Sequence, residues 1–160
     1  MSRSHRLITV PLVALAVLAG LLTGCTPKSD PNTGGDAGAV AVSYLKASDQ
    51  GDDEARCRLS TTGQGDKYDK CVSVDEPGPK VLTADPEVTE VTDWTDPRTG
   101  IRWTAVTTKQ TASSSPNPIW TAVGLTNTDN RWLVDVITGI DGDPTVKGAG
   151  RQAVENENAG

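Results

Sequence analysis

The stretch AGAVAVSYLKASDQG, residues 37–51, decides the fold of this chain, because it predicts the helix on which the rest has to pack. Its apolar and small residues recur at intervals of three and four, which places them on one face of an α-helix. Asp36 can cap the start of this helix and Gly51 can end it. The predicted face consists of Ala37, Val40, Ala41, Tyr44, Leu45 and Ser48.

A second, shorter helix is predicted directly afterwards, in DDEARCRLS at residues 52–60. Its acidic residues lie in the first turn, where the helix dipole favours negative charge. Ala55 and Leu59 share one face of this helix. The next residues, TTGQGDK, contain two glycines and predict a loop.

The character of the sequence changes after Pro79, where threonine, valine and tryptophan begin to alternate with polar residues. This pattern predicts two β-hairpins, one formed by residues 87–94 and 101–111 and the other by residues 119–127 and 131–140. Residues 80–84 could add a further strand. In the last strand the alternation places Trp132, Val134 and Val136 on one face and Asp135 on the other.

Two helices followed by a run of strands indicate an α+β fold rather than alternating βαβ units. We therefore expect an N-terminal helix pair packed on a curved antiparallel sheet of four to five strands. The alternative is a small β-sandwich with one external helix.

The order of these elements resembles the nuclear transport factor two-like, cystatin-related cone fold. The resemblance is carried by Tyr44, Leu45, Lys46, Asp49, Gly51, Asp52 and Ala55 in the helices and by Trp132, Leu133, Val134 and Asp135 in the last strand. It implies a pocket between the helices and the concave face of the sheet. The chain departs from the family pattern in two ways: a third helix is hard to find unless residues 62–72 form it, and phenylalanine is absent.

The N-terminus has the features of an export signal. Arg3 and Arg6 precede an uncharged apolar run over residues 7–22, and Leu22-Thr23-Gly24-Cys25 follows. This resembles the lipobox of bacterial lipoproteins, of which many small actinobacterial examples share the layout described above. The resemblance implies cleavage before Cys25 and a lipid on its sulfur, which would hold the protein at the extracytoplasmic face of the cell membrane. The alternatives are an ordinary signal peptide and a buried membrane cysteine.

These boundaries divide the chain into four parts. We expect a signal peptide at residues 1–24, a flexible tether rich in proline and glycine at residues 25–36, one α+β domain at residues 37–141 and a disordered tail at residues 142–160.

Cleavage before Cys25 would remove the only histidine and two arginines, so the formal charge would change from −6 to −8. Histidine-based acid–base catalysis and histidine metal ligation are then excluded. The scattered acids and the lack of a basic patch argue against a nucleic-acid partner. We expect no cofactor and no metal, and we expect that the protein is not an enzyme.

Cys57 and Cys71 remain as an even pair in an exported chain, which favours a structural disulfide. Their spacing is far from that of a Cys-x-x-Cys redox motif, and two thiols without histidine make a poor zinc site.

Three residues are candidates for a ligand-binding site. Asp135 is the one acid within an apolar strand, and it is either a pocket carboxylate or a hydrogen-bonded residue on the outer face of the sheet. Tyr44 and Trp103 could line a cavity or belong to the core. Trp94 and Trp103 flank the first hairpin turn and are expected to form a cross-strand pair. Asp141-Gly142-Asp143 is interpreted as a turn rather than a calcium loop.

The function expected from these features is that of a non-catalytic binding or assembly module of the cell envelope. Its partners would be the membrane, through the lipidated Cys25, and an envelope protein complex. One alternative is a carrier of a small apolar or lipid-like ligand in a cone pocket. The other alternative is an enzyme that uses a pocket carboxylate.

Overall fold

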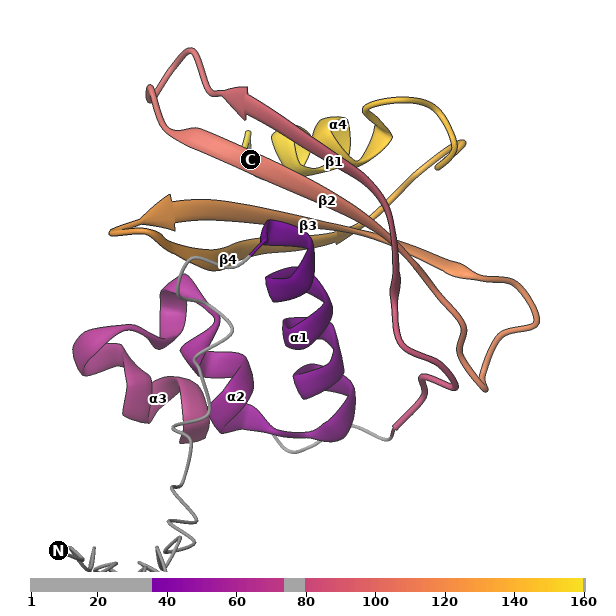
Figure 1. The fold of residues 1–160 in the computed structure, drawn as a ribbon, viewed down its shortest axis with the longest axis horizontal. Coiled ribbons are helices and arrows are strands. Elements are labelled where there is room, and N and C mark those ends of the chain that lie inside the picture. Colours follow the sequence, from indigo (N-terminus) through magenta and orange to yellow (C-terminus); the bar gives the residue numbers. More distant parts are fainter. Residues whose placement is uncertain (1–35, 74–79, 160) are drawn as a thin grey trace, which may run out of the picture.

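A computed structural model describes residues 36–73 and 80–159 of the chain. The predicted signal peptide, Cys25 and most of the predicted tether lie outside the described residues. The fold is α+β, with helices on both faces of a curved antiparallel sheet (Figure 1).

The first helix, α1 (Ala37–Gln50), has the bounds that its sequence predicts. The Asp36 carboxylate accepts a hydrogen bond from the Gly38 N–H at 3.1 Å, which caps the start of the helix. Gly51 ends the helix with a φ of 67°, in the left-handed region that glycine adopts without steric cost. The short α2 (Asp53–Arg58) follows, and the Asp52 carboxylate caps it by accepting from the Ala55 N–H at 3.0 Å.

The expected loop after α2 is partly helical. Two 3₁₀ turns, Thr61–Gly63 and Gly65–Lys67, lead into α3 (Tyr68–Ser73). Residues 62–72, the stretch in which a third helix can lie, are thus largely 3₁₀ and α-helical. They form a compact unit with α2, beside α1 on one face of the sheet (Figure 1).

The sheet is a meander with strand order β1-β2-β3-β4. Its strands are β1 (Glu87–Thr95), β2 (Arg102–Gln110), β3 (Ile119–Thr128) and β4 (Arg131–Gly139). Both predicted hairpins are present. Asp129 and Asn130 make the second turn with φ values of 51° and 62°, the pair of positive values that a two-residue hairpin turn requires. Residues 80–84 add only a single bridge, between Leu82 and Ala112.

The main core lies between α1 and the sheet. Val40 and Ala41 of α1 are fully buried against Val106, Val123 and Leu125 of the two central strands. Burial of a valine or leucine side chain stabilises the fold by about 1.5–3 kcal/mol, so this layer fixes where α1 lies on the sheet.

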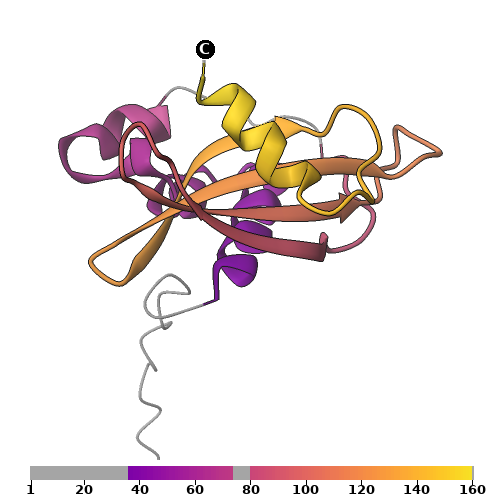
Figure 2. The ribbon, with the colours of Figure 1, turned by 90° about the horizontal axis from the view of Figure 1, so that it is seen from above.

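The C-terminal segment corrects one prediction. The sequence predicts disorder for residues 142–160, but residues 149–157 form a helix, α4 (Ala149–Glu157), which covers the opposite face of the sheet (Figure 2). Val154 of α4 is fully buried beside Trp94, Trp103, Ala105 and Ala122. The folded domain therefore continues beyond residue 141. The segment is polar overall, and only a few of its residues, mostly small ones, make buried contacts. Its composition is therefore typical of a disordered tail.

A β-bulge in β4 corrects a second prediction. Gly124 pairs with Val136 and Leu125 pairs with Val134, which leaves Asp135 as an extra residue without a partner on β3. The bulge reverses the alternation. Trp132 and Val134 pack in the α1 layer, whereas Val136 packs in the α4 layer. The three residues therefore do not share a face, and one strand contributes to both cores.

Candidate functional site

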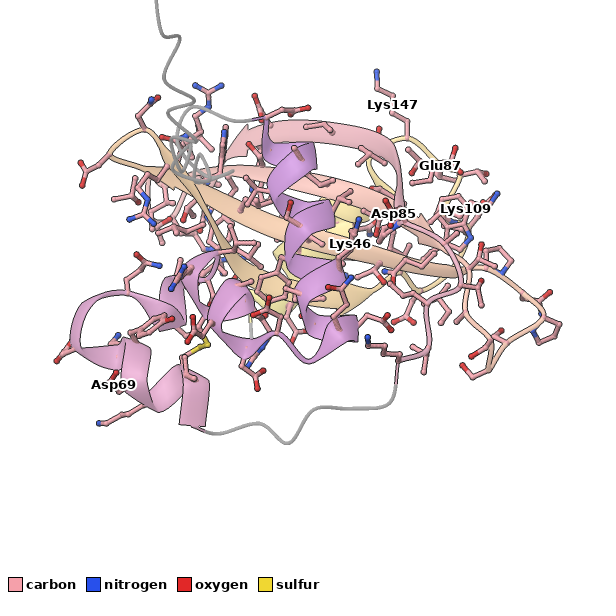
Figure 3. All side chains as sticks on the ribbon, turned by 60° about the horizontal axis from the view of Figure 1, so that its bottom comes forward. Lys46, Asp69, Asp85, Glu87, Lys109 and Lys147 are labelled. Atoms are coloured by element: carbon pink, nitrogen blue, oxygen red, sulfur yellow. A yellow bond between two sulfur atoms is a disulfide. The ribbon has the colours of Figure 1, made fainter. Side chains whose placement is uncertain are left out.

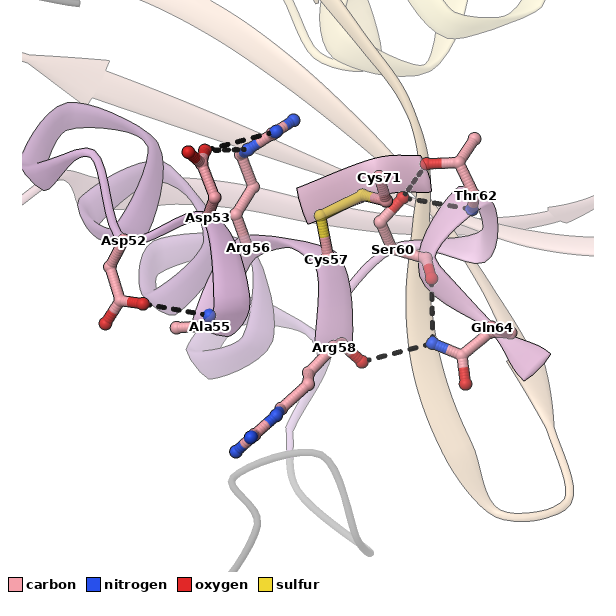
Figure 4. The surroundings of a disulfide bond; sticks show 10 residues. All are labelled: Asp52, Asp53, Ala55, Arg56, Cys57, Arg58, Ser60, Thr62, Gln64 and Cys71. Atoms are coloured by element: carbon pink, nitrogen blue, oxygen red, sulfur yellow. Dashed lines mark hydrogen bonds and ion pairs between the residues drawn. A yellow bond between two sulfur atoms is a disulfide. The ribbon is translucent and has the colours of Figure 1, made fainter. Parts of the chain in front are cut away.

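The expected disulfide is formed. Cys57 of α2 and Cys71 of α3 are bonded, with their Cα atoms 5.9 Å apart (Figure 4). Gly63 lies close to this link, because a Cβ atom at residue 63 would come within 1.9 Å of the Cys57 carbonyl oxygen. The Gln64 side chain donates to the carbonyl oxygens of Arg58 and Ser60 and holds the same turn. The disulfide and these contacts therefore have a structural role, because they hold α2 and α3 together.

The fold does not bring together the three residues predicted to bind a ligand. Tyr44 is 8% exposed and packs in the α1 core, while Trp103 is 6% exposed and lies on the α4 face of the sheet. Asp135 is exposed at the bulge, where its carboxylate accepts a hydrogen bond from the Thr61 hydroxyl. Asp135 is therefore an exposed, hydrogen-bonded residue at the edge of the helical layer.

The Trp94–Trp103 pair is confirmed as cross-strand neighbours in β1 and β2. Their rings stack with centroids 6.0 Å apart and planes 18° apart. The guanidinium carbon of Arg151 in α4 lies 5.8 Å from the centroid of the Trp94 ring, a cation–π distance. The pair therefore joins the first hairpin to α4.

A cavity of about 200 Å³ opens beside this pair, and we call it the hairpin cavity. The β1–β2 turn forms one wall and the end of α4 forms the other. Its lining residues are Trp94, Asp96, Pro97, Arg98, Trp103, Glu155 and Asn158.

A second cavity, of about 390 Å³, lies along the other side of α4, and we call it the loop cavity. It lies between the end of β4, the loop over residues 141–147 and the helix face that carries Ala149, Gln152, Ala153 and Asn156. Asp143 in this loop accepts hydrogen bonds from the hydroxyl and the N–H of Thr145, and these bonds lower the pKa of its carboxyl. Asp143 thus begins a hydrogen-bonded turn, and Asp141 and Gly142 precede it in the loop.

The β1–β2 turn is held by one carboxylate. Asp96 accepts hydrogen bonds from the Arg98 N–H at 2.8 Å and from the Thr99 hydroxyl at 3.0 Å. These bonds, the Arg98 N–H first, lower the pKa of Asp96. A second carboxylate, Asp93 on β1, accepts a hydrogen bond from the Thr104 hydroxyl at 2.6 Å. This bond lowers the pKa of Asp93, and Arg102 lowers it further.

A third hollow, of about 170 Å³, lies at the end of α1. There the Asp49 carboxylate accepts hydrogen bonds from the N–H groups of Val81 and Leu82 at 2.7 and 2.9 Å. Lys46 forms an exposed ion pair with Asp85 at 2.9 Å (Figure 3). Both contacts fasten the segment that enters the sheet to α1, so they are explained by the fold.

Sequence reasoning missed α4 and the two cavities beside it. A signal was present, since Gly150, Ala153 and Val154 recur at intervals of three and four. Glycine lowers helix propensity, and the flanking residues are polar, so this pattern is weak by itself.

Within the described parts of the chain, no group of three or more histidine, cysteine or acidic side chains is placed to hold a metal ion. The same residues contain no helix that is both long enough and apolar enough to cross a membrane. No protein-family model, curated protein or solved structure matches the chain.

Proposed function

We propose that this protein is a lipoprotein anchored through Cys25 at the extracytoplasmic face of the cell membrane, where it acts as a non-catalytic binding or assembly module of the envelope. The anchor is supported by Leu22-Thr23-Gly24-Cys25 after an apolar run. The disulfide between Cys57 and Cys71 supports export, because such bonds persist in oxidising compartments.

The packed interior between α1 and the sheet is the observation that carries the choice of a binding module. A carrier with a cone pocket needs a cavity lined by Tyr44 at this place. Tyr44 is instead packed in a cluster with Val106, Val123 and Leu125, each fully buried. Close-packed interiors of this kind leave no room for a ligand. Recognition would then take place on the outer surface of the domain.

Mass spectrometry under native conditions tests this proposal on protein extracted gently from its own membranes. We expect a second protein to be retained with the lipidated chain. A retained lipid or other small apolar molecule in place of a protein would favour the carrier and contradict the proposal. Recovery of the bare chain from extracts in which other complexes survive would also contradict it.

The anchor has a separate test. Cys25→Ser should abolish labelling by fatty acid and release the protein from the membrane fraction. Cys57→Ser is the matched control, because it removes a disulfide-bonded cysteine of the domain and should leave lipid labelling intact. Unchanged membrane retention of the Cys25→Ser protein would show that the anchor is wrong.

A further inference from the structure

The hairpin cavity combines an aromatic floor with a polar rim. The stacked rings of Trp94 and Trp103, each more than nine-tenths buried, reach its inner wall, and Pro97 closes one side. Arg98, Glu155 and Asn158 line it as well, and the side chains of Arg98 and Glu155 are 60% and 39% exposed. Binding sites for small ligands have this composition, in which an apolar surface holds the ligand and a few polar groups orient it.

The size of the cavity limits what can enter it. Its volume of about 200 Å³ lies below the roughly 300–1,000 Å³ of pockets that hold a drug-sized ligand. This is the scale of one six-membered sugar ring or one amino-acid side chain.

The charges around the cavity are balanced. Arg98 pairs with Asp96, and Arg151 pairs with Glu155 at 2.9 Å. The cavity is therefore close to neutral on a chain whose formal net charge is −6. A charged ligand would lose its hydration shell in the cavity and find no unpaired opposite charge there to compensate. A neutral ligand avoids this cost.

Hydrogen-bonding capacity remains at the rim. The Asn158 side chain lines the cavity, and its amide offers both donors and an acceptor. Arg98 uses its backbone N–H and its Nε on Asp96, and its exposed terminal nitrogens can donate further. Glu155 has a second carboxylate oxygen that can accept, since the bonds from Arg151 go to Oε1.

From this geometry we propose that the hairpin cavity binds a neutral sugar, with one pyranose ring of a glycan entering the space above Trp94 and Trp103. The C–H groups of a pyranose match the apolar floor, and its hydroxyls match an amide, a carboxylate and a guanidinium. The walls are already ordered, because Asp96 holds the turn through the Arg98 N–H and the Thr99 hydroxyl. Ordered walls reduce the entropy lost on binding.

This site does not depend on the proposed anchor, since its lining residues lie in the first hairpin, in α4 and at the Asn158 C-cap of that helix. The sugar site and the anchoring proposal can therefore fail independently of each other.

Calorimetric titration of the purified full chain with three neutral oligosaccharides tests the sugar site. The probes are chitotetraose, maltotetraose and mannotetraose, and we expect at least one to bind in the micromolar to millimolar range. Asn158→Ala and Arg98→Ala should each weaken that binding about tenfold. Asn156→Ala is the matched control, because Asn156 lies two residues before Asn158 but lines the loop cavity. The Asn156→Ala variant should bind the oligosaccharide with the affinity of the wild type.

Circular dichroism and urea denaturation would show that each variant remains folded. The proposal is wrong if none of the three oligosaccharides binds, or if binding is equal in the wild type and in both cavity variants. A proline-rich decapeptide, titrated in parallel, tests the alternative that the cavity binds a segment of a protein partner. Binding of this peptide, lost in Asn158→Ala, without binding of any sugar would assign the cavity to a protein partner and overturn the sugar site.

Discussion

Gly124 of β3 lies directly beneath Val154 of α4, where a Cβ atom on residue 124 would come within 2.7 Å of Val154 Cγ1. The relation is reciprocal, because a Cβ atom on Gly150 of α4 would come within 2.1 Å of the Thr107 hydroxyl oxygen on the sheet. One glycine on each surface thus allows the helix to lie close to the strands. This fit positions α4, although Val154 is its only large side chain that is fully buried.

Gly124→Ala should therefore destabilise the protein by about 1–3 kcal/mol, the usual cost of inserting atoms into a packed core. The added methyl group would push Val154 and α4 away from the sheet. Urea denaturation would give the loss, and hydrogen exchange would show faster exchange of the α4 amides while those of α1 stay protected.

Gly139→Ala is the control for this substitution. It is also a strand glycine, but a Cβ atom there would meet no atom within 4 Å. The Gly139→Ala variant should be as stable as the wild type or slightly more stable, since alanine restricts the unfolded chain more than glycine does. Equal effects of the two substitutions would show that the close approach of α4 is not what matters.

Removal of the disulfide should lower stability. The bond closes a loop with a sequence separation of 14, for which the chain-entropy model gives about 3 kcal/mol. The Cys57→Ala/Cys71→Ala double variant should show this loss in urea denaturation. Reducing agent should destabilise the wild type by a similar amount and leave the double variant unaffected. Sensitivity of the double variant to reductant would contradict this assignment.

Asp49→Ala should release the segment at residues 81–82 from α1. The carboxylate accepts two backbone N–H groups, and hydrogen bonds to a charged group contribute about 1.5–3 kcal/mol each when they are sheltered from water. These bonds are part-buried, so we expect a loss at the lower end of this range. Asp85→Ala removes only an exposed ion pair with Lys46 and should cost less than about 1 kcal/mol. A larger loss in Asp85→Ala would reverse this ranking.

Acid should weaken the first hairpin. The pKa values of Asp93 and Asp96 are lowered from 3.8 in the folded protein, so the folded state favours their ionised forms. Their contribution is complete above the unfolded-state pKa and is lost as the pH falls through the folded-state value.

Stability should accordingly be constant near neutral pH and decline below about pH 4. Asp96→Asn removes the charge but keeps an oxygen that can accept hydrogen bonds. The variant should be less stable than the wild type at pH 7, and the difference should shrink at pH 3. Urea denaturation at both pH values would measure this, and a difference independent of pH would exclude a role for the charge.

The parts of the fold that the sequence predicts correctly are those encoded by neighbouring residues. The α1 face repeats at intervals of three and four, and Asp36 and Gly51 mark its ends. Asp129 and Asn130 suit the left-handed backbone that the second hairpin turn needs. Such signals are local, so they can be read before the tertiary structure is known.

The parts that the sequence does not predict depend on contacts between distant residues. The place of α4 depends on Gly124 and Gly150, which are 26 positions apart in the sequence. Their effect on packing can be recognised only when both lie at the contact between α4 and the sheet. The bulge at Asp135 leaves no trace in the alternation of β4, because Val134 and Val136 are both apolar. The hairpin cavity requires the end of α4 to lie next to Pro97 and Arg98. A site assembled in this way cannot be found before α4 is placed.

The two-sided arrangement of the sheet also determines what can happen to the domain at a surface. The domain begins at α1 on one face, about eleven residues after Cys25, and α4 lies on the other. Eleven extended residues span at most about 40 Å, so a domain held at Cys25 would stay within that distance of its anchor. Its α4 face could still turn away from the membrane, and attachment and glycan capture would then not compete for the same side of the molecule.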